Sequence, residues 1–227
     1  MNTSQDSPPI CLLHPGKTGG TYLKSILRHN KAGWTKPLKL LPHRETLIST
    51  ARRFGPDRKL AFTFRDPADR FVSAFQSRLR QGRPTYNRVW SPAEAMAFLY
   101  FENPNDLAEA LDSASERTRS AAYFAFKSIM HIKTDYRYHF ETLQTLAEET
   151  PSIVACIDVE NLDTALAAFL QRLGINEFTL PEQAIRHASD TPAETLSEHA
   201  FRNLRTFWSA EFELFDAFKH IEATLLP

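Results

Sequence analysis

Residues 60–79 read LAFTFRDPADRFVSAFQSRL, and they are the most informative part of the chain about its fold. Its first five residues are apolar apart from Thr63, which is typical of a strand buried on both faces of a parallel sheet. Asp66 can cap a helix, Pro67 suits its first turn, and Asp69 adds a negative charge there. A strand that leads directly into a helix predicts parallel strands joined by right-handed crossovers.

Two further apolar runs, Ile10–Leu13 and Ile153–Ile157, predict strands of the same kind. A helical pattern of apolar residues follows each of them, over residues 21–30 and 162–173. We expect the second of these helices to stop at Gly174, the usual position of a left-handed cap. The alternation of strand and helix indicates the α/β class.

The pattern changes to helix after helix at about residues 92–149, and residues 196–225 are again helical. We therefore expect a P-loop-like parallel β-sheet core flanked by helices, with a helical insertion and a helical C-terminus. At 227 residues, the chain is expected to form a single domain over residues 1–227. The loop Gly82–Pro92 is the segment most expected to be flexible.

Composition excludes several classes of protein. Apolar residues make up 42% and charged residues 24%, as in ordinary globular domains, so a disordered or fibrous chain is excluded. The 27 Lys and Arg balance the 27 Asp and Glu, which speaks against a strongly basic nucleic-acid binder. Residues 1–90 nevertheless hold 17 basic and 5 acidic residues, so we expect a polyanion to meet this part.

The two cysteines indicate the compartment. Cys11 and Cys156 both lie within apolar runs, which predicts buried thiols rather than a disulfide framework. Residues 1–10 lack the basic and apolar regions of a signal peptide, and no apolar run is long enough to span a bilayer. We expect a cytoplasmic protein.

The stretch HPGKTGGT, residues 14–21, follows the first strand. It contains three of the seven glycines of the chain: Gly16, Gly19 and Gly20. A strand that turns through glycines into a helix exposes backbone N–H groups and the positive end of the helix dipole, which together bind anions. Lys17 adds a positive charge, and Thr18 and Thr21 add hydroxyl donors. A nucleotide triphosphate loop would need glycine where Cys11 stands.

Arg65 marks a second anion site. It stands at the carboxyl end of a predicted parallel strand, the edge where open α/β sheets bind ligands. Ser73 lies two turns into the following helix. A guanidinium beside a hydroxyl suits a phosphate dianion.

These two motifs resemble those of the carbohydrate sulfotransferases, the family that includes enzymes of the heparan and chondroitin type. Its members use 3′-phosphoadenosine 5′-phosphosulfate (PAPS) as the sulfate donor. Residues 13–21 resemble the family loop His-x-Pro-Lys-Thr-Gly-Gly-Thr, with the departure that Pro15 and Gly16 fill the two places before Lys17. The second motif is similar to the family's Arg-Asp-Pro-x-x-Arg-x-x-Ser. It is complete at Arg65, Asp66, Pro67, Arg70 and Ser73.

The resemblance implies a donor site and a reaction. PAPS as donor, and adenosine 3′,5′-bisphosphate (PAP) as product, would be held without a metal ion by Lys17, Thr18, Gly19, Gly20, Thr21, Tyr22, Arg65 and Ser73. Arg65 and Ser73 would bind the 3′-phosphate, and Arg70 would hold either the loop or the nucleotide. The acceptor would be a hydroxyl of a carbohydrate or small metabolite, with no nucleic acid or membrane involved. The lack of a membrane-spanning run fits a bacterial or otherwise cytosolic enzyme. The oligomeric state stays open.

Sulfuryl transfer needs a cation at the leaving group and a base at the acceptor. Lys17 can supply the cation, and histidine is the side chain whose pKa suits the base. His43 is our candidate, because it resembles the histidine that many family members place ahead of the second strand. His14, His131 and His139 are its rivals.

Two other functions remain open at this point. A P-loop nucleotide kinase or NTPase would use Asp158, after the third strand, as its magnesium ligand. A non-catalytic polyanion-binding module would use residues 83–90, where cations alternate with aromatic side chains.

Overall fold

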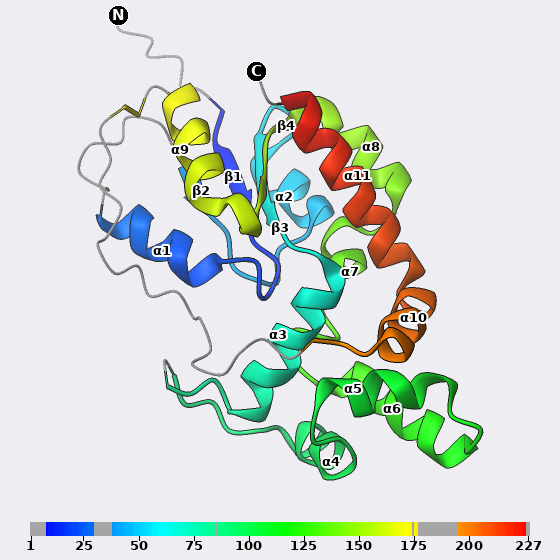
Figure 1. Cartoon of the computed structure of the whole chain (residues 1–227). Coiled ribbons are helices and arrows are strands. Elements are labelled where there is room, and N and C mark those ends of the chain that lie inside the picture. The colour runs from blue at the N-terminus through cyan, green and yellow to red at the C-terminus, as the bar shows by residue number, and fades with distance from the viewer. Residues whose placement is uncertain (1–7, 30–37, 85, 174, 177–194, 226–227) are drawn as a thin grey trace, which may run out of the picture. The chain divides into compact units, whose positions relative to one another are not determined.

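The computed structural model describes residues 8–29, 38–84, 86–173, 175–176 and 195–225 (Figure 1). In chain order the elements are β1 (Ile10–Leu13), α1 (Gly20–His29), β2 (Leu38–Leu40), α2 (Leu47–Phe54), β3 (Lys59–Phe64), α3 (Pro67–Leu79), α4 (Pro92–Tyr100), α5 (Pro104–Glu109), η2 (Ala110–Asp112), α6 (Glu116–Ser128), α7 (Tyr136–Phe140), α8 (Leu143–Glu149), η3 (Thr150–Ser152), β4 (Ile153–Asp158), η4 (Val159–Asn161), α9 (Leu162–Arg172), α10 (Glu198–Phe207) and α11 (Ser209–Leu225).

The sheet has four parallel strands in the order β2-β1-β3-β4. The predicted parallel α/β core is therefore confirmed, and three of its strands lie where the sequence places them. The fourth, β2, was not predicted because it is only three residues long and none of them is fully buried. Its register is set by the pair Ile10 and Leu38.

Contacts divide the chain into two compact units. The first comprises residues 1–64, 138–186 and 216–227, and it contains the sheet. Helices α1 and α9 cover one face of this sheet with a cluster that includes Leu23 and Leu166 (Figure 1). On the other face the rings of Phe62, Phe140 and Phe218 meet with centroids 4.7 to 5.0 Å apart. Each side of the sheet is thus buried, as its apolar strands predict.

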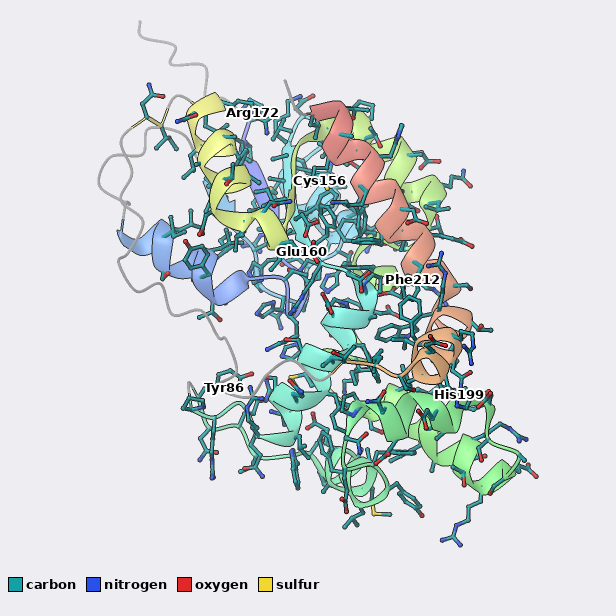
Figure 2. All side chains as sticks on the ribbon, in the orientation of Figure 1. Tyr86, Cys156, Glu160, Arg172, His199 and Phe212 are labelled. Carbon is teal, nitrogen blue, oxygen red and sulfur yellow. The ribbon has the colours of Figure 1, made fainter. Side chains whose placement is uncertain are left out.

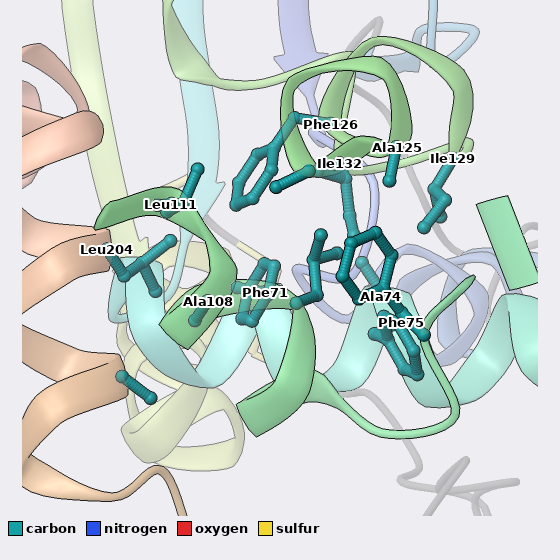
Figure 3. Close-up of a cluster of buried hydrophobic side chains, with 14 of the residues drawn as sticks. Phe71, Ala74, Phe75, Ala108, Leu111, Ala125, Phe126, Ile129, Ile132 and Leu204 are labelled. Atoms are coloured by element: carbon teal, nitrogen blue, oxygen red, sulfur yellow. The ribbon is translucent and has the colours of Figure 1, made fainter. Parts of the chain in front are cut away.

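The second unit comprises residues 65–137 and 187–215. Its core is a cluster of buried side chains from α3, α4, α5, α6 and α10 (Figure 3). The cap at the start of α3 forms as predicted, since the Asp66 carboxylate accepts hydrogen bonds from the N–H groups of Ala68 (2.8 Å) and Asp69 (3.1 Å). The predicted helical insertion is confirmed as the α-helices α4 to α8 with η2 among them, although α8 and the end of α7 belong to the first unit.

The flexibility expected of Gly82–Pro92 stays a prediction, but a buried ion pair holds part of this segment. The buried Arg78 guanidinium forms an ion pair with Glu94 (Nε to Oε1, 2.7 Å) and donates to the carbonyls of Arg88 and Val89. Burial alone would raise the pKa of Glu94, but two hydrogen bonds from Arg78 and one each from the N–H groups of Ser91 and Met130 outweigh it and lower this pKa to about 2. The second half of the segment is therefore held at Arg88, Val89 and Ser91 by an ion pair inside the second unit.

The structure also bears on the predictions about the cysteines, Gly174 and membrane-spanning helices. Cys11 and Cys156 are buried free thiols, as expected; Cys156 lies in β4 (Figure 2). Gly174 lies outside the described residues. None of the helices that the structure describes is long and apolar enough to cross a bilayer.

Candidate functional site

The loop between β1 and α1 has the backbone geometry of an anion site. Lys17 (φ 73°) and Gly19 (φ 77°) both adopt left-handed conformations. Left-handed residues in such a turn direct successive N–H groups toward one side, and the first N–H groups of α1 have no partner within the helix. A Cβ at Gly19 would lie 2.9 Å from Leu162 Cδ2, so this path needs glycine. The loop therefore presents donors and the positive end of a helix dipole.

The buried side chain of His14 packs against this loop at Gly20. Its side chain is only 2% exposed, and neither ring nitrogen bonds to any residue that the structure describes. Burial lowers the pKa of His14 to about 3, with a further contribution from His43, so the ring is neutral at physiological pH. A Cβ at Gly20 would lie 2.6 Å from His14 Nδ1, which shows how closely the start of α1 packs on this ring. As a rival base, His14 is enclosed rather than exposed to an acceptor.

Thr18 fastens the loop to the sheet. Its hydroxyl lies 2.7 Å from the carbonyl oxygen of Pro15 and 2.7 Å from the hydroxyl of Thr63 in β3. Its backbone N–H also donates to Pro15, at 3.3 Å. Both donors of Thr18 thus shape the loop, and their use toward a ligand stays a prediction. Thr21 is exposed, while the Tyr22 hydroxyl turns away and donates to Asp163 at 2.5 Å.

His43 lies in the turn between β2 and α2, beside the end of β1. Its Nδ1 is 2.9 Å from the carbonyl oxygen of His14, and the two rings meet edge to face with centroids 4.2 Å apart. A proton on Nδ1 that is donated to this carbonyl leaves the lone pair on Nε2, the form that a general base requires. Desolvation lowers the pKa of His43, and Lys24 and Lys17 lower it further, against the hydrogen bond to His14.

The other two rival histidines have structural contacts. His139 is buried, with its Nδ1 2.9 Å from the carbonyl oxygen of Glu45, and the neighbouring Tyr138 hydroxyl donates to the Arg44 carbonyl at 3.2 Å. These bonds hold the turn that contains His43. His131, in the second unit, has a left-handed backbone, and its carbonyl accepts a hydrogen bond from Arg70 at 2.8 Å.

Arg65 and Ser73 belong to the second unit. The Arg65 side chain is half-buried, and its guanidinium forms no hydrogen bond or ion pair with the residues that the structure describes. The Ser73 hydroxyl, on α3, is likewise half-buried and bonds to none of those residues. Both groups are therefore available to a ligand.

Arg70 has a structural position. Its guanidinium is fully buried, forms an ion pair with Glu211 (3.2 Å) and donates to the carbonyl oxygens of His131 and Thr134. Arg70 therefore holds residues 131–134, which the family resemblance does not imply, and the roles that the resemblance does imply for it stay predictions. Glu211 could not have been identified from the sequence, because it stands 141 residues from its partner.

The magnesium aspartate of the kinase alternative is engaged elsewhere. Asp158 ends β4 and is buried, with its Oδ2 2.9 Å from the ammonium group of Lys219 and its Oδ1 accepting from the Glu160 N–H at 3.0 Å. A carboxylate that is neutralised by a lysine and used as a cap is a poor ligand for a divalent cation. Asp158, the residue that the kinase alternative needs, is therefore poorly suited to that role.

A cavity of about 640 Å³ lies in the second unit, but it contains none of the predicted site residues. Its lining includes Asp106, Glu109, Asp112 and His199, which Figure 2 labels, and His199 Nε2 is 2.9 Å from Asp112 Oδ2. Carboxylates repel an anionic nucleotide, so this cavity is unsuited to the donor.

The predicted residues thus fall into two groups. Lys17 to Tyr22 and His43 gather at one end of the sheet in the first unit, and Arg65 and Ser73 lie in the second. One family model, described as "Sulfotransferase family", matches residues 12–219 and so includes both groups. Neither the curated proteins nor the solved structures gave a match to the chain.

Proposed function

Because the chain belongs to the sulfotransferase family, we propose that it transfers a sulfuryl group from PAPS to a hydroxyl of a carbohydrate or small metabolite, acting as one domain. The observation that supports this most is the loop of left-handed Lys17 and Gly19, which opens onto the first turn of α1 beside His43. A nucleotide with anionic groups at two positions matches a chain with two sets of anion-binding residues.

The two sets of residues suit different parts of the donor. The N–H groups at the start of α1 and the Lys17 ammonium bind the 5′-phosphosulfate, where backbone donors and a mobile cation meet several oxygens at once. The Arg65 guanidinium and the Ser73 hydroxyl bind the 3′-phosphate, since a planar fork of donors recognises a phosphate dianion with defined geometry.

The chemistry requires two further acts from the chain. His43 Nε2 accepts the proton of the acceptor hydroxyl as that oxygen attacks sulfur, so a new S–O bond forms while the bond between sulfur and the phosphate oxygen breaks. Lys17 stabilises the negative charge that develops on this phosphate oxygen as it leaves with PAP. Preorganised charge of this kind supplies most of the rate enhancement in transfers where the protein forms no covalent intermediate.

The test is transfer of labelled sulfate from PAPS to a panel of carbohydrates and small hydroxyl compounds, run without added metal. We expect label to appear in at least one acceptor together with an equal amount of PAP. PAPS that remains intact with every acceptor, while ATP is hydrolysed when magnesium is added, would contradict the proposal and favour the kinase.

A further inference from the structure

Arg65 occupies a position where neither the sheet nor a helix bonds its backbone. It follows the last residue of β3 and precedes the capping residue Asp66 of α3. The phenol of Tyr136 instead bonds to both the N–H and the carbonyl oxygen of Arg65. Its oxygen accepts a hydrogen bond from the Arg65 N–H (2.8 Å), and its O–H donates to the Arg65 carbonyl oxygen (2.6 Å). One side chain therefore holds the peptide groups on both sides of the Arg65 Cα.

Tyr136 is itself held rigidly within the second unit. Its side chain is fully buried, and the Arg70 guanidinium lies over its ring, 4.9 Å from the centroid. Its backbone N–H donates to Glu211 Oε2 (2.8 Å), while the next residue, Arg137, donates to Oε1 (2.9 Å). Burial raises the pKa of Tyr136, so the phenol keeps the proton that it donates to Arg65.

We propose that Tyr136 is a positioning residue, which fixes the backbone of Arg65 so that its guanidinium meets the 3′-phosphate of the donor; this rests on the proposed function. Two hydrogen bonds that flank one Cα restrict its φ and ψ, and these angles set the direction of the Cα–Cβ bond. A long arginine side chain amplifies any error in that direction. Recognition of a phosphate by a guanidinium fork depends on alignment, so a loosened Arg65 binds it less well.

The alternative is a tyrosine that only stabilises the core. Both roles predict lower stability when the hydroxyl is removed, so a melting temperature cannot separate them. The two roles differ in which nucleotide the variant binds more weakly. A positioning role acts through Arg65 and affects PAP but not 5′-AMP, which lacks the 3′-phosphate. A purely structural role affects the two nucleotides equally or leaves both unchanged.

The experiment measures the dissociation constants of PAP and 5′-AMP by calorimetry for the intact chain and for Tyr136→Phe. Tyr123→Phe is the matched control, because Tyr123 is an exposed tyrosine of the same unit whose ring stacks on Phe207. We expect Tyr136→Phe to reduce the preference for PAP about tenfold, the effect of losing part of a charge-assisted hydrogen bond, while 5′-AMP binding stays unchanged. The control should behave as the unaltered chain.

A double-mutant cycle with Arg65→Ala sharpens the result. If Tyr136 acts through Arg65, adding Tyr136→Phe to Arg65→Ala produces little further loss of PAP affinity. Additive losses, or an unchanged preference in a folded Tyr136→Phe variant, would overturn the inference. If Tyr136→Phe does not fold, Glu211→Gln replaces it in the same cycle, with a smaller loss of preference expected and the same overturning outcomes. An unaltered chain that binds PAP no better than 5′-AMP would instead contradict the 3′-phosphate assignment itself.

Discussion

The loop of residues 14–22 and the segment of residues 65–73 are both suited to anions, yet they are built differently. The loop would use backbone N–H groups, and the left-handed residues that direct them, Lys17 and Gly19, lie within the loop itself, although Thr18 also bonds to Thr63 in β3. The segment uses a guanidinium, and its backbone is held by Tyr136, 71 residues away. A backbone site can therefore be recognised in the local sequence, whereas the support of a side-chain site cannot.

The largest effect is expected from the one cation of the loop. Lys17→Ala should lower kcat about 10²–10³-fold, the usual result of removing a group that stabilises transition-state charge. Alanine meets the same strain as lysine at a φ of 73°, so the fold should be kept. Sulfate transfer and circular dichroism measure the two effects. Lys133→Ala is the control, because Lys133 is exposed. An unchanged kcat in Lys17→Ala would show that Lys17 does not take part in the reaction.

His43→Asn tests the proposed base. We expect kcat to fall about 100-fold, as is usual when a general base is lost, while PAP affinity is unchanged. Because the pKa of His43 is lowered from 6.5, the residue stays neutral as the pH falls through 6.5. The acid limb of kcat/KM against pH should therefore lie below 6.5 and disappear in His43→Asn. Loss of PAP binding in this variant would show that His43 belongs to the donor site.

Gly20→Ala tests whether the loop depends on its close packing. The new Cβ would meet His14 Nδ1 at 2.6 Å, so the start of α1 must shift. We expect PAP to bind about tenfold more weakly, in line with the usual cost of overpacking. Adding His14→Ala should restore part of this affinity. An unchanged PAP affinity in Gly20→Ala, or no recovery on adding His14→Ala, would refute the packing argument.

The smallest effect is expected at the second segment. Ser73→Ala removes one hydroxyl, so PAP affinity should fall about threefold to tenfold, the net worth of one ordinary hydrogen bond at a half-exposed position. The affinity for 5′-AMP should not change. Ser77→Ala, one turn further along α3, is the control, because its hydroxyl is 3.3 Å from that of Tyr86. If both serine variants behave alike, Ser73 does not bind the 3′-phosphate.

Much of the fold follows from local sequence. The strand and capped helix at residues 60–79 and the glycine loop have the predicted structure, because hydrophobic burial, capping and glycine geometry act over a few residues. Strand β2 was missed because a three-residue strand has too few buried positions to form a pattern. The ion pair of Arg78 and Glu94, which holds part of Gly82–Pro92, was also missed, because its two residues lie outside that segment.

The candidate site was predictable in its residues but not in its support. The motifs identify Lys17, Arg65 and Ser73 as candidates, and chemistry suggests a histidine. Which histidine is enclosed and which is exposed depends on the tertiary structure, which buries His14 and leaves His43 at the surface. The hydrogen bonds that hold His43 to His14 and Arg65 to Tyr136 join residues far apart in the sequence, so they leave no local pattern in it.

The most direct test of the donor site is a calorimetric titration with PAP, without metal, beside a titration with ATP and magnesium. The proposed function predicts metal-independent binding of PAP that weakens strongly in Arg65→Ala. Binding of ATP that requires magnesium, with no binding of PAP, would contradict it.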